Sequence, residues 1–311
     1  MSPAKLDYKK FRFIPTALLC AWLGLFFPAC ATVETFLPGE GVLGVSRALP
    51  KEHDLYIYAD VNANRDIFDQ LISMLGVEED RVRRVADQTE HLFLSVDDIG
   101  SENVSFTAIA SGNYPTAMLS FGLRIDSEWQ RHKTDFLWYQ AKGRNLQIGL
   151  PGAGHIFISS SSMERMAEGW DDVVDVRQPE RSSKSFASFL EEYGTGAIAV
   201  VYAANLGSFS SFLGEEISQM RGRALILMEE AQDGYEARFL LFFERAAAAR
   251  VTALMLRAYA LRERKNGSAR FGEDVVIKAD DRTTLVYPVY IKKEEVINLI
   301  GLLEQNEVIF K

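Results

Sequence analysis

The sequence predicts an α+β fold made of two similar halves of antiparallel sheet, with helices packed on one face. Strand-like and helix-like runs alternate along the chain, and short turns join neighbouring strand-like runs, as in antiparallel hairpins. The same series of elements occurs twice, roughly 140 residues apart, which indicates an internal duplication. Because 48% of the 311 residues are hydrophobic and 25% are charged, the composition is that of an ordinary globular protein.

The first half opens with a β-rich run at residues 55–61, after which apolar side chains from Ile67 to Leu75 recur at the spacing of one helix face. The later elements expected in this half are strands at 91–96 and 104–110, a helix at 116–132, a hairpin at 136–159 and a short helix at 163–169. This order predicts a sheet with at least one long helix packed on it.

The second half repeats this order, beginning with a β-rich run at 197–203 and helically spaced apolar residues from Phe209 to Ile217. The later elements expected here are strands at 224–228 and 235–243, a helix at 246–264, a hairpin at 274–291 and a short helix at 294–304. The long helix is favoured by its many alanines and by Leu254, Leu256 and Leu261. A polar stretch at 171–185 separates the halves.

The resulting domain plan has five parts. They are a signal peptide at 1–29, a cysteine and tether at 30–50, a first α+β repeat at 51–170, a connection at 171–190 and a second repeat at 191–311. The tether is expected because residues 31–50 contain several prolines and glycines and show no sustained period.

The N-terminal segment has the order of a secretory signal peptide, with a basic region at residues 4–12 before an uncharged apolar run at 13–29. The run is short for a membrane span, which needs about 20 apolar residues. It also contains Pro15 and Pro28, which disfavour a continuous α-helix. We therefore expect this segment to be cleaved rather than to span a membrane.

The end of the run, Leu25-Phe26-Phe27-Pro28-Ala29-Cys30, resembles a lipobox, the site at which bacterial lipoproteins are diacylated on cysteine and cut just before it. Phe27 and Pro28 depart from the usual pattern, a looseness similar to that of spirochaete lipoproteins of unknown function. The resemblance implies an exported protein held in a membrane by a lipid on Cys30, on the periplasmic or outer-membrane side. An uncleaved anchor and ordinary signal cleavage are the alternatives.

Charge and cysteine content exclude several classes of protein. Residues 30–311 have 30 basic and 42 acidic side chains, a net charge of −12, which disfavours nucleic acid and anionic lipid as electrostatic partners. The two cysteines are Cys20 and Cys30, so a chain cut before Cys30 has no second cysteine for an internal disulfide or a thiolate metal site.

No motif indicates catalysis, a metal or a cofactor. The glycine-rich run at 149–154 lacks the Lys-Ser/Thr of a phosphate-binding loop and precedes a strand-like run, so a hairpin turn is favoured over a ligand loop. Ser161 and Glu164 have the spacing of a helix capping box. Four histidines, at positions 53, 91, 132 and 155, show no metal-binding spacing. Paired aspartates at 97–98, 171–172 and 280–281 suit solvated turns.

These observations predict a lipid-anchored envelope protein that acts as a non-catalytic interaction or structural module. Its partners would be the membrane, through the lipid on Cys30, and another envelope protein. Aromatic side chains that could contact such a partner are Tyr114, Trp129, Trp138 and Tyr139, although packing in the core is the simpler reading for Tyr114. A solute-binding lipoprotein with a cleft between the halves and, further off, an envelope hydrolase are the alternatives.

Overall fold

A computed structural model describes residues 42–74, 87–99, 104–152, 154–174, 186–194, 196–209, 217, 219–232, 234–267 and 270–296. Cys30, the signal segment before it and most of the helix expected at 294–304 lie outside these residues.

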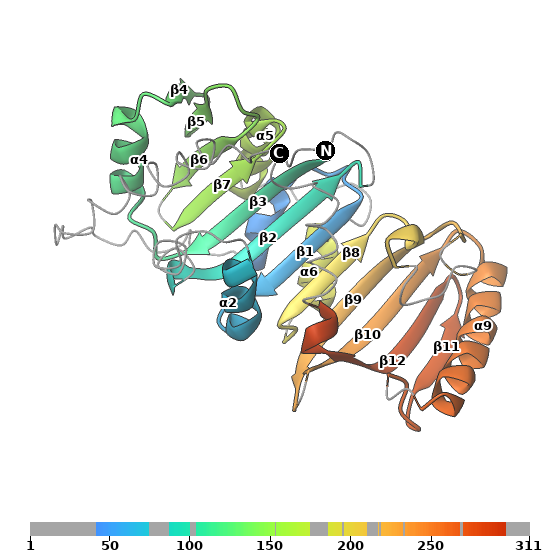
Figure 1. Cartoon of the computed structure of the whole chain (residues 1–311). Coiled ribbons are helices and arrows are strands. Elements are labelled where there is room, and N and C mark those ends of the chain that lie inside the picture. Colours follow the sequence, from blue (N-terminus) through green and yellow to red (C-terminus); the bar gives the residue numbers. More distant parts are fainter. Residues whose placement is uncertain are drawn as a thin grey trace, which may run out of the picture.

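The described strands form one twelve-stranded sheet in which each hydrogen-bonded pair of neighbours is antiparallel (Figure 1). In chain order they are β1 (Leu55–Asp60), β2 (Thr89–Asp97), β3 (Ser105–Gly112), β4 (Trp129–Lys133), β5 (Leu137–Ala141), β6 (Gln147–Gly152), β7 (His155–Ser159), β8 (Ala199–Ala203), β9 (Gly222–Ala231), β10 (Gly234–Phe243), β11 (Val276–Asp280) and β12 (Thr283–Lys292).

The two halves meet at the pairing of β1 with β8, where Leu55 lies opposite Ala203 and Ala59 lies opposite Ala199. Outward from this seam the order is β1-β2-β3-β7-β6 on one side and β8-β9-β10-β12-β11 on the other. The halves therefore place corresponding strands at corresponding positions, with β5 and β4 added at one edge. This arrangement confirms the predicted α+β class and merges both halves into one sheet. The duplication itself stays a prediction.

Helical segments cover both faces of the sheet, not one face as predicted. They are η3 (Val42–Ala48), α2 (Arg65–Met74), α4 (Thr116–Ile125), α5 (Met163–Val174), α6 (Phe186–Tyr193), η4 (Leu206–Phe209) and α9 (Ala246–Lys265), the two η segments being 3-10 helices. Successive side chains of a strand point to opposite faces. Along the central strands successive residues are apolar rather than alternately apolar and polar. Both faces of the sheet are therefore apolar, and both need to be covered.

The first face is covered by η3, α5 and α6. Its core includes Tyr56 and Phe93 from the sheet, Met166 from α5 and Phe189 from α6. Tyr56 stacks on Phe186 of α6 with ring centroids 5.1 Å apart. Packing on this face thus spans the seam between β1 and β8.

The last part of the tether expected over residues 30–50 is packed in this core, whereas residues 30–41 lie outside the described residues. Val45, Ala48 and Leu49 are at most 4% exposed, although the glycines and prolines around them suggested a loose segment. The carbonyl of Ala48 and its Cα lie so close to Gly169 of α5 that a Cβ there would be 2.9 Å from Ala48 Cα. The sequence shows no apolar periodicity here because a short 3-10 segment buries scattered side chains rather than one face.

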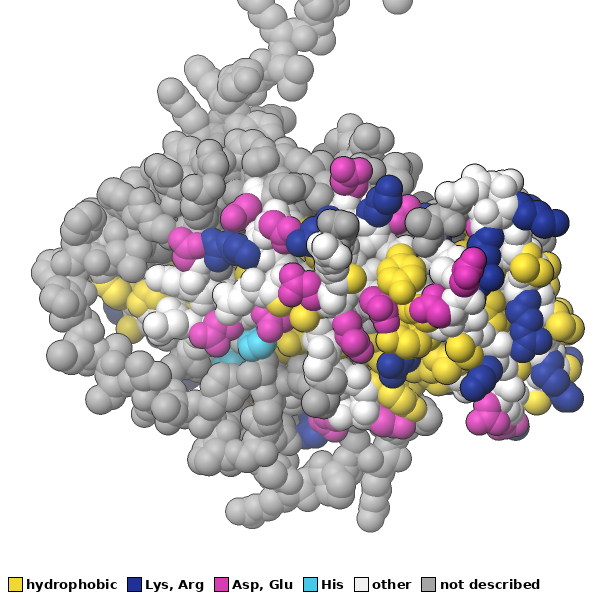
Figure 2. All heavy atoms as spheres, turned by 90° about the horizontal axis from the view of Figure 1, so that it is seen from below, with side chains coloured by type: hydrophobic (Ala, Val, Ile, Leu, Met, Phe, Trp, Pro, Cys, Tyr) yellow, Lys and Arg dark blue, Asp and Glu magenta, His cyan; other side chains and the backbone are white. Residues whose placement is uncertain are grey.

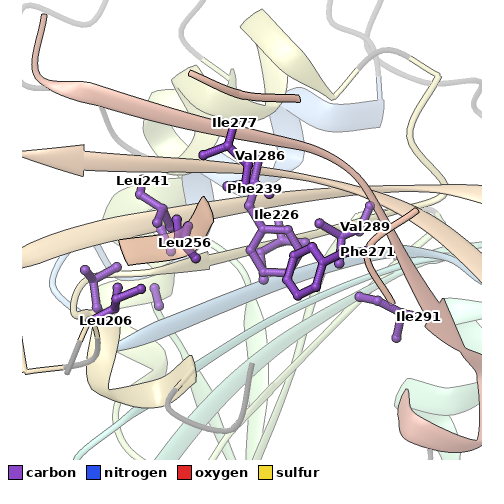
Figure 3. Packing of buried hydrophobic residues seen from close by; sticks show 14 of the residues in the cluster. Leu206, Ile226, Phe239, Leu241, Leu256, Phe271, Ile277, Val286, Val289 and Ile291 are labelled. Carbon is purple, nitrogen blue, oxygen red and sulfur yellow. The ribbon is translucent and has the colours of Figure 1, made fainter. Parts of the chain in front are cut away.

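The second face is covered by α4 and α2 over the first half and by α9 and η4 over the second. Ala253 and Leu256 of α9 pack on residues of β9, β10, β11 and β12, and Leu123 of α4 packs beside Tyr139 and Ile156. Figure 3 shows Leu256 beside Leu241, with Ile226, Phe239 and Phe271 gathered further along the same cluster. The long helix expected at 246–264 is confirmed almost to the residue.

Two boundaries differ from the prediction because tertiary pairing overrides local spacing. The helix expected at 116–132 ends at Ile125, and Trp129–Lys133 instead pair with β5, so that His132 lies opposite Trp138. The connection expected at 171–190 contains the end of α5 and most of α6, whose Phe189 and Leu190 are fully buried. Polar residues near α6 concealed its short apolar face.

Candidate functional site

An exposed apolar row runs along the outer side of α9. Val251, Leu254 and Leu261 are 47%, 62% and 58% exposed, and Ala258 between them is also exposed. Their offsets of three, seven and ten residues from Val251 place them on one side of an α-helix. The buried residues Ala249, Thr252, Ala253, Leu256 and Ala260 lie on the opposite side, against the sheet. The helix is therefore apolar on two opposite sides.

Arginines of α9 fix the helix to the edge of the sheet. The Arg257 guanidinium donates to the Ile277 carbonyl through Nη2 at 2.7 Å and Nε at 3.2 Å, and Arg264 Nε donates to the Phe271 carbonyl at 3.1 Å. These bonds satisfy backbone oxygens near the edge strand β11. Because these bonds fix the rotation of α9 about its axis, they also keep its exposed apolar row directed outward.

A second exposed apolar row lies on α4. Phe121 and Ile125 are 64% and 60% exposed, and Ala117, one turn earlier, is exposed as well. The spacing of four residues again puts these side chains on one side of the helix, opposite the buried Gly122 and Leu123. Pro115 precedes the helix, where the lack of a backbone N–H costs nothing.

The two rows occupy matching places in the two halves. Each belongs to the helix that covers the second face of the sheet, following β3 in one half and β10 in the other. At the right of Figure 2, where α9 lies, Lys and Arg side chains are interspersed with hydrophobic ones, whereas acidic side chains are common towards the centre. These rows are the candidate functional site, called the α4 row (Ala117, Phe121, Ile125) and the α9 row (Val251, Leu254, Ala258, Leu261).

The aromatic residues expected as possible partner contacts lie elsewhere. Tyr114, Trp138 and Tyr139 are buried, with 7%, 4% and no exposure, and Trp129 is half-buried against the α4 core. The Tyr114 hydroxyl bonds to Thr89 and the Tyr139 hydroxyl donates to the Ser120 carbonyl at 3.0 Å. They are packing residues, as the simpler reading for Tyr114 held, and do not form a surface patch.

The leucine spacing did not reveal the two rows, because such a spacing does not distinguish a buried side of a helix from an exposed one. Leu254, Leu256 and Leu261 support the helix equally in the sequence, yet Leu256 alone among them is buried. A signal was available in the pattern around them: α9 has apolar residues around most of its circumference, more than one buried side needs.

Two buried histidines are bonded to serines without forming a catalytic array. His53 Nδ1 and His155 Nδ1 each lie 2.9 Å from a serine hydroxyl, that of Ser95 and that of Ser111. Burial lowers the pKa of His155 to about 4 and also lowers the pKa of His53, against an opposing effect of Asp97. At neutral pH both rings are neutral. Among the described residues, no group of three or more His, Cys, Asp or Glu side chains could hold a metal ion.

The other two candidate motifs have structural roles. The glycine-rich run is the expected hairpin turn, in which β6 ends at Gly152, β7 begins at His155 and Gly154 has a φ of +80°. The cap of α5 is Ser162, not Ser161: its hydroxyl accepts from the Arg165 N–H at 3.4 Å and donates to Glu164 at 3.1 Å. The box is shifted by one residue because Ser161 lies instead beside Ser159.

The fold and these rows define a class of protein: a single antiparallel sheet covered on both faces, with apolar helix surfaces turned outward on one of them. The chain belongs to the family described as outer membrane-associated lipoprotein TP0453, whose model matches residues 48–221, more than half of the chain. TP0453 is a lipoprotein of a spirochaete, Treponema. The predicted spirochaete-like lipoprotein class, exported and anchored at a membrane on the envelope side, is thereby confirmed.

Solved structures of TP0453 have the same fold. Crystal form III has a TM-score of 0.58 at 15% identity, with 85% of this chain and 99% of that chain covered. Crystal form I has a TM-score of 0.55 at 15% identity over 86% and 99% of the two chains, and crystal form IV has 0.56 at 16% over 83% and 96%. A search of curated proteins finds no match. None of the described helices is long and apolar enough to cross a bilayer.

Proposed function

We propose that this protein is a lipid-anchored, non-catalytic envelope protein whose folded body makes a second contact with the membrane surface through the α4 and α9 rows. The observation that carries the proposal is the exposure of Phe121, Ile125, Leu254 and Leu261, each at 58% or more, on two helices of the same sheet face. Soluble surfaces rarely keep such rows in water unless they meet an apolar partner.

The energetics favour a membrane as that partner. Full burial of one Leu, Ile or Phe side chain stabilises by about 1.5–3 kcal/mol, so several partly buried side chains supply a contact of moderate strength. A lipid on Cys30 would hold the body near the bilayer, and tethering raises the effective concentration of a second, weaker contact. Two acyl chains already give stable anchoring, so the rows would serve to orient the body against the bilayer rather than to retain it there.

The joint between the halves supports a role without a ligand cleft. β1 and β8 are hydrogen-bonded neighbours from Leu55 to Ala59, and the rings of Tyr56, Phe186 and Tyr202 fill one side of this joint. A solute-binding protein of the predicted alternative type would need an open cleft there. A hydrolase would need a nucleophile and a base that a substrate can reach, whereas both His–Ser pairs are buried and no member of them is more than 7% exposed, which argues against the hydrolase alternative.

The test is vesicle flotation of the mature chain, residues 30–311, carrying Cys30→Ser, which removes the lipid as well as the apolar signal segment and leaves the body to bind alone. We expect the protein to float with the vesicles, and Phe121→Glu with Leu254→Glu to abolish this. Ile99→Glu is the matched control, since Ile99 is 37% exposed and lies outside both rows. Flotation unchanged by the row variants would refute the proposal. Loss of a crosslinked envelope protein in those variants, without vesicle binding, would assign the rows to a protein partner instead.

A further inference from the structure

We propose that α9 gives the membrane contact a preference for anionic phospholipid headgroups, whereas α4 binds without regard to headgroup charge. This inference rests on the proposed membrane contact and adds the chemistry of the lipid that is recognised. It also revises the expectation, based on total charge, that anionic lipid is not an electrostatic partner.

The charge of α9 is opposite to that of the protein. The whole chain has a net charge of −9, yet α9 has one acidic residue, Glu263, and five basic ones: Arg250, Arg257, Arg262, Arg264 and Lys265. A helix with an exposed apolar row and flanking bases is the pattern of a helix that lies in the membrane interface. Total charge acts over long distances and is screened by salt, so a local basic surface decides contact at short range.

Two of the five bases support the fold, and three remain for a ligand. Arg257 and Arg264 donate to backbone carbonyls, as described above. Arg250, Arg262 and Lys265 are exposed and make no ion pair with a carboxylate among the residues that the structure describes, and Arg250 makes one long bond within its own helix, from Nε to the Ala246 carbonyl at 3.4 Å. The exposed Arg262 lies over the Tyr259 ring, with 5.2 Å between its guanidinium carbon and the ring centroid.

The three bases are placed to reach headgroups when the α9 row is buried. At 100° per residue, Arg250 lies on one flank of the row and Arg262 on the other, and Lys265 continues the row by one turn beyond Leu261. Long basic side chains extend along an apolar surface and keep their charge at the interface. Burial of Leu254 and Leu261 would therefore bring three cationic groups level with the phosphates.

The α4 row lacks this feature. Arg124 is the one charged residue of α4, and the exposed side chains beside it are those of Phe121 and Ile125. Its contribution depends on apolar burial, which does not distinguish anionic from zwitterionic headgroups. Both helices thus contribute to the affinity for the membrane, whereas α9 alone contributes the preference for anionic headgroups.

The experiment measures binding of the mature chain, residues 30–311 with Cys30→Ser, to vesicles of phosphatidylcholine alone and of phosphatidylcholine with phosphatidylglycerol, at low and high salt. We expect tighter binding to the anionic vesicles at low salt, with about a fivefold loss for each base removed. The triple variant Arg250→Gln, Arg262→Gln and Lys265→Gln should lose the preference and keep binding to phosphatidylcholine. Circular dichroism of each variant checks that it is folded.

The control variant removes three exposed bases elsewhere: Arg221→Gln, Arg223→Gln and Lys278→Gln, of which Arg223 and Lys278 point to the opposite face of the sheet from α9. It should keep the preference. Equal binding of the parent protein to both vesicles would overturn the headgroup inference and leave the membrane contact standing. An equal loss in the control would also overturn it, since total charge would then be the cause. Binding to neither vesicle would overturn both proposals.

Discussion

The Tyr235 hydroxyl donates a 2.8 Å hydrogen bond to Oδ1 of Asn64, 171 residues earlier in the chain. Asn64 is 5% exposed, and its Nδ2 donates to the carbonyls of Asp60 at 2.7 Å and Ile198 at 3.0 Å. One buried amide thus joins the end of β1 to the residue before β8 and to β10. It is a buried polar link between the halves, which also meet through backbone pairing, apolar packing and the ion pair between Lys293 and Asp66.

We expect Asn64→Ala to destabilise the protein more than Tyr235→Phe does. The first change removes three hydrogen bonds and leaves the buried Tyr235 hydroxyl without its Asn64 acceptor, although the carbonyls of Asp60 and Ile198 still accept from the backbone N–H groups of Asn64 and Asp60. The second change removes one of these bonds and leaves the side-chain oxygen of Asn64 without its donor. An unsatisfied buried group costs about 1–3 kcal/mol, so Tyr235→Phe should lie within that range and Asn64→Ala above it. Urea unfolding gives both values. Equal losses would mean that Asn64 acts through Tyr235 alone.

Substitution of Gly169 tests whether η3, the segment before β1, is packed against α5. In a helix, Gly→Ala stabilises by up to about 1 kcal/mol when space allows. Here the new Cβ would lie 2.9 Å from Ala48 Cα and 3.1 Å from two backbone oxygens. We therefore expect Gly169→Ala to lower the free energy of unfolding by about 1–3 kcal/mol. Gly152→Ala, where nothing lies within 4 Å, is the control; a stabilised Gly169→Ala protein would show that η3 is not packed there.

The protein should lose stability as pH falls below 6.5. The pKa of His155 is lowered to about 4 in the folded protein, from about 6.5 in the unfolded chain. Between these values the unfolded state binds a proton that the folded state does not, so acid favours unfolding by about 1.4 kcal/mol per pH unit for this residue. The effect is absent above pH 6.5.

Chemical unfolding at pH 7 and pH 5 measures this loss. His155→Gln should reduce the difference in unfolding free energy between the two pH values, because the amide does not titrate and can still bond to Ser111. His53, whose pKa is also lowered, should leave a smaller residual slope. An unchanged pH dependence in His155→Gln would show that other groups cause it.

The capping assignment can be tested with two adjacent serines. Ser162→Ala should destabilise the protein by about 0.5–2 kcal/mol, because the N–H of Arg165 loses its acceptor at the start of α5. Ser161→Ala should cost less, because the Ser161 hydroxyl lies 3.3 Å from that of Ser159 rather than accepting from an amide of α5. Thermal unfolding of both variants distinguishes them, and the reverse order would restore Ser161 as the cap.

Elements with a long and regular pattern were predictable. The alanine-rich helix was expected at 246–264 and is observed at Ala246–Lys265, and the hairpin expected at 274–291 is observed as β11 and β12. Helix propensity and turn residues act through neighbouring residues in the chain, so the local sequence is enough to predict such elements. The end of α4 was not predictable, because residues 129–132 fit helical spacing until β5 pairs with them.

The sequence by itself predicted the class of element at most positions, the repeated order of the halves and a lipobox-like motif that ends at Cys30. These properties depend on neighbouring residues or on a linear motif. The tertiary structure alone decided that β1 and β8 join the halves into one sheet, that Trp138 and Tyr139 are interior, and that Leu254 and Leu261 face outward while Leu256 faces inward. Burial depends on which segments distant in the chain pack together, and a helical spacing is the same for a covered side as for an exposed one.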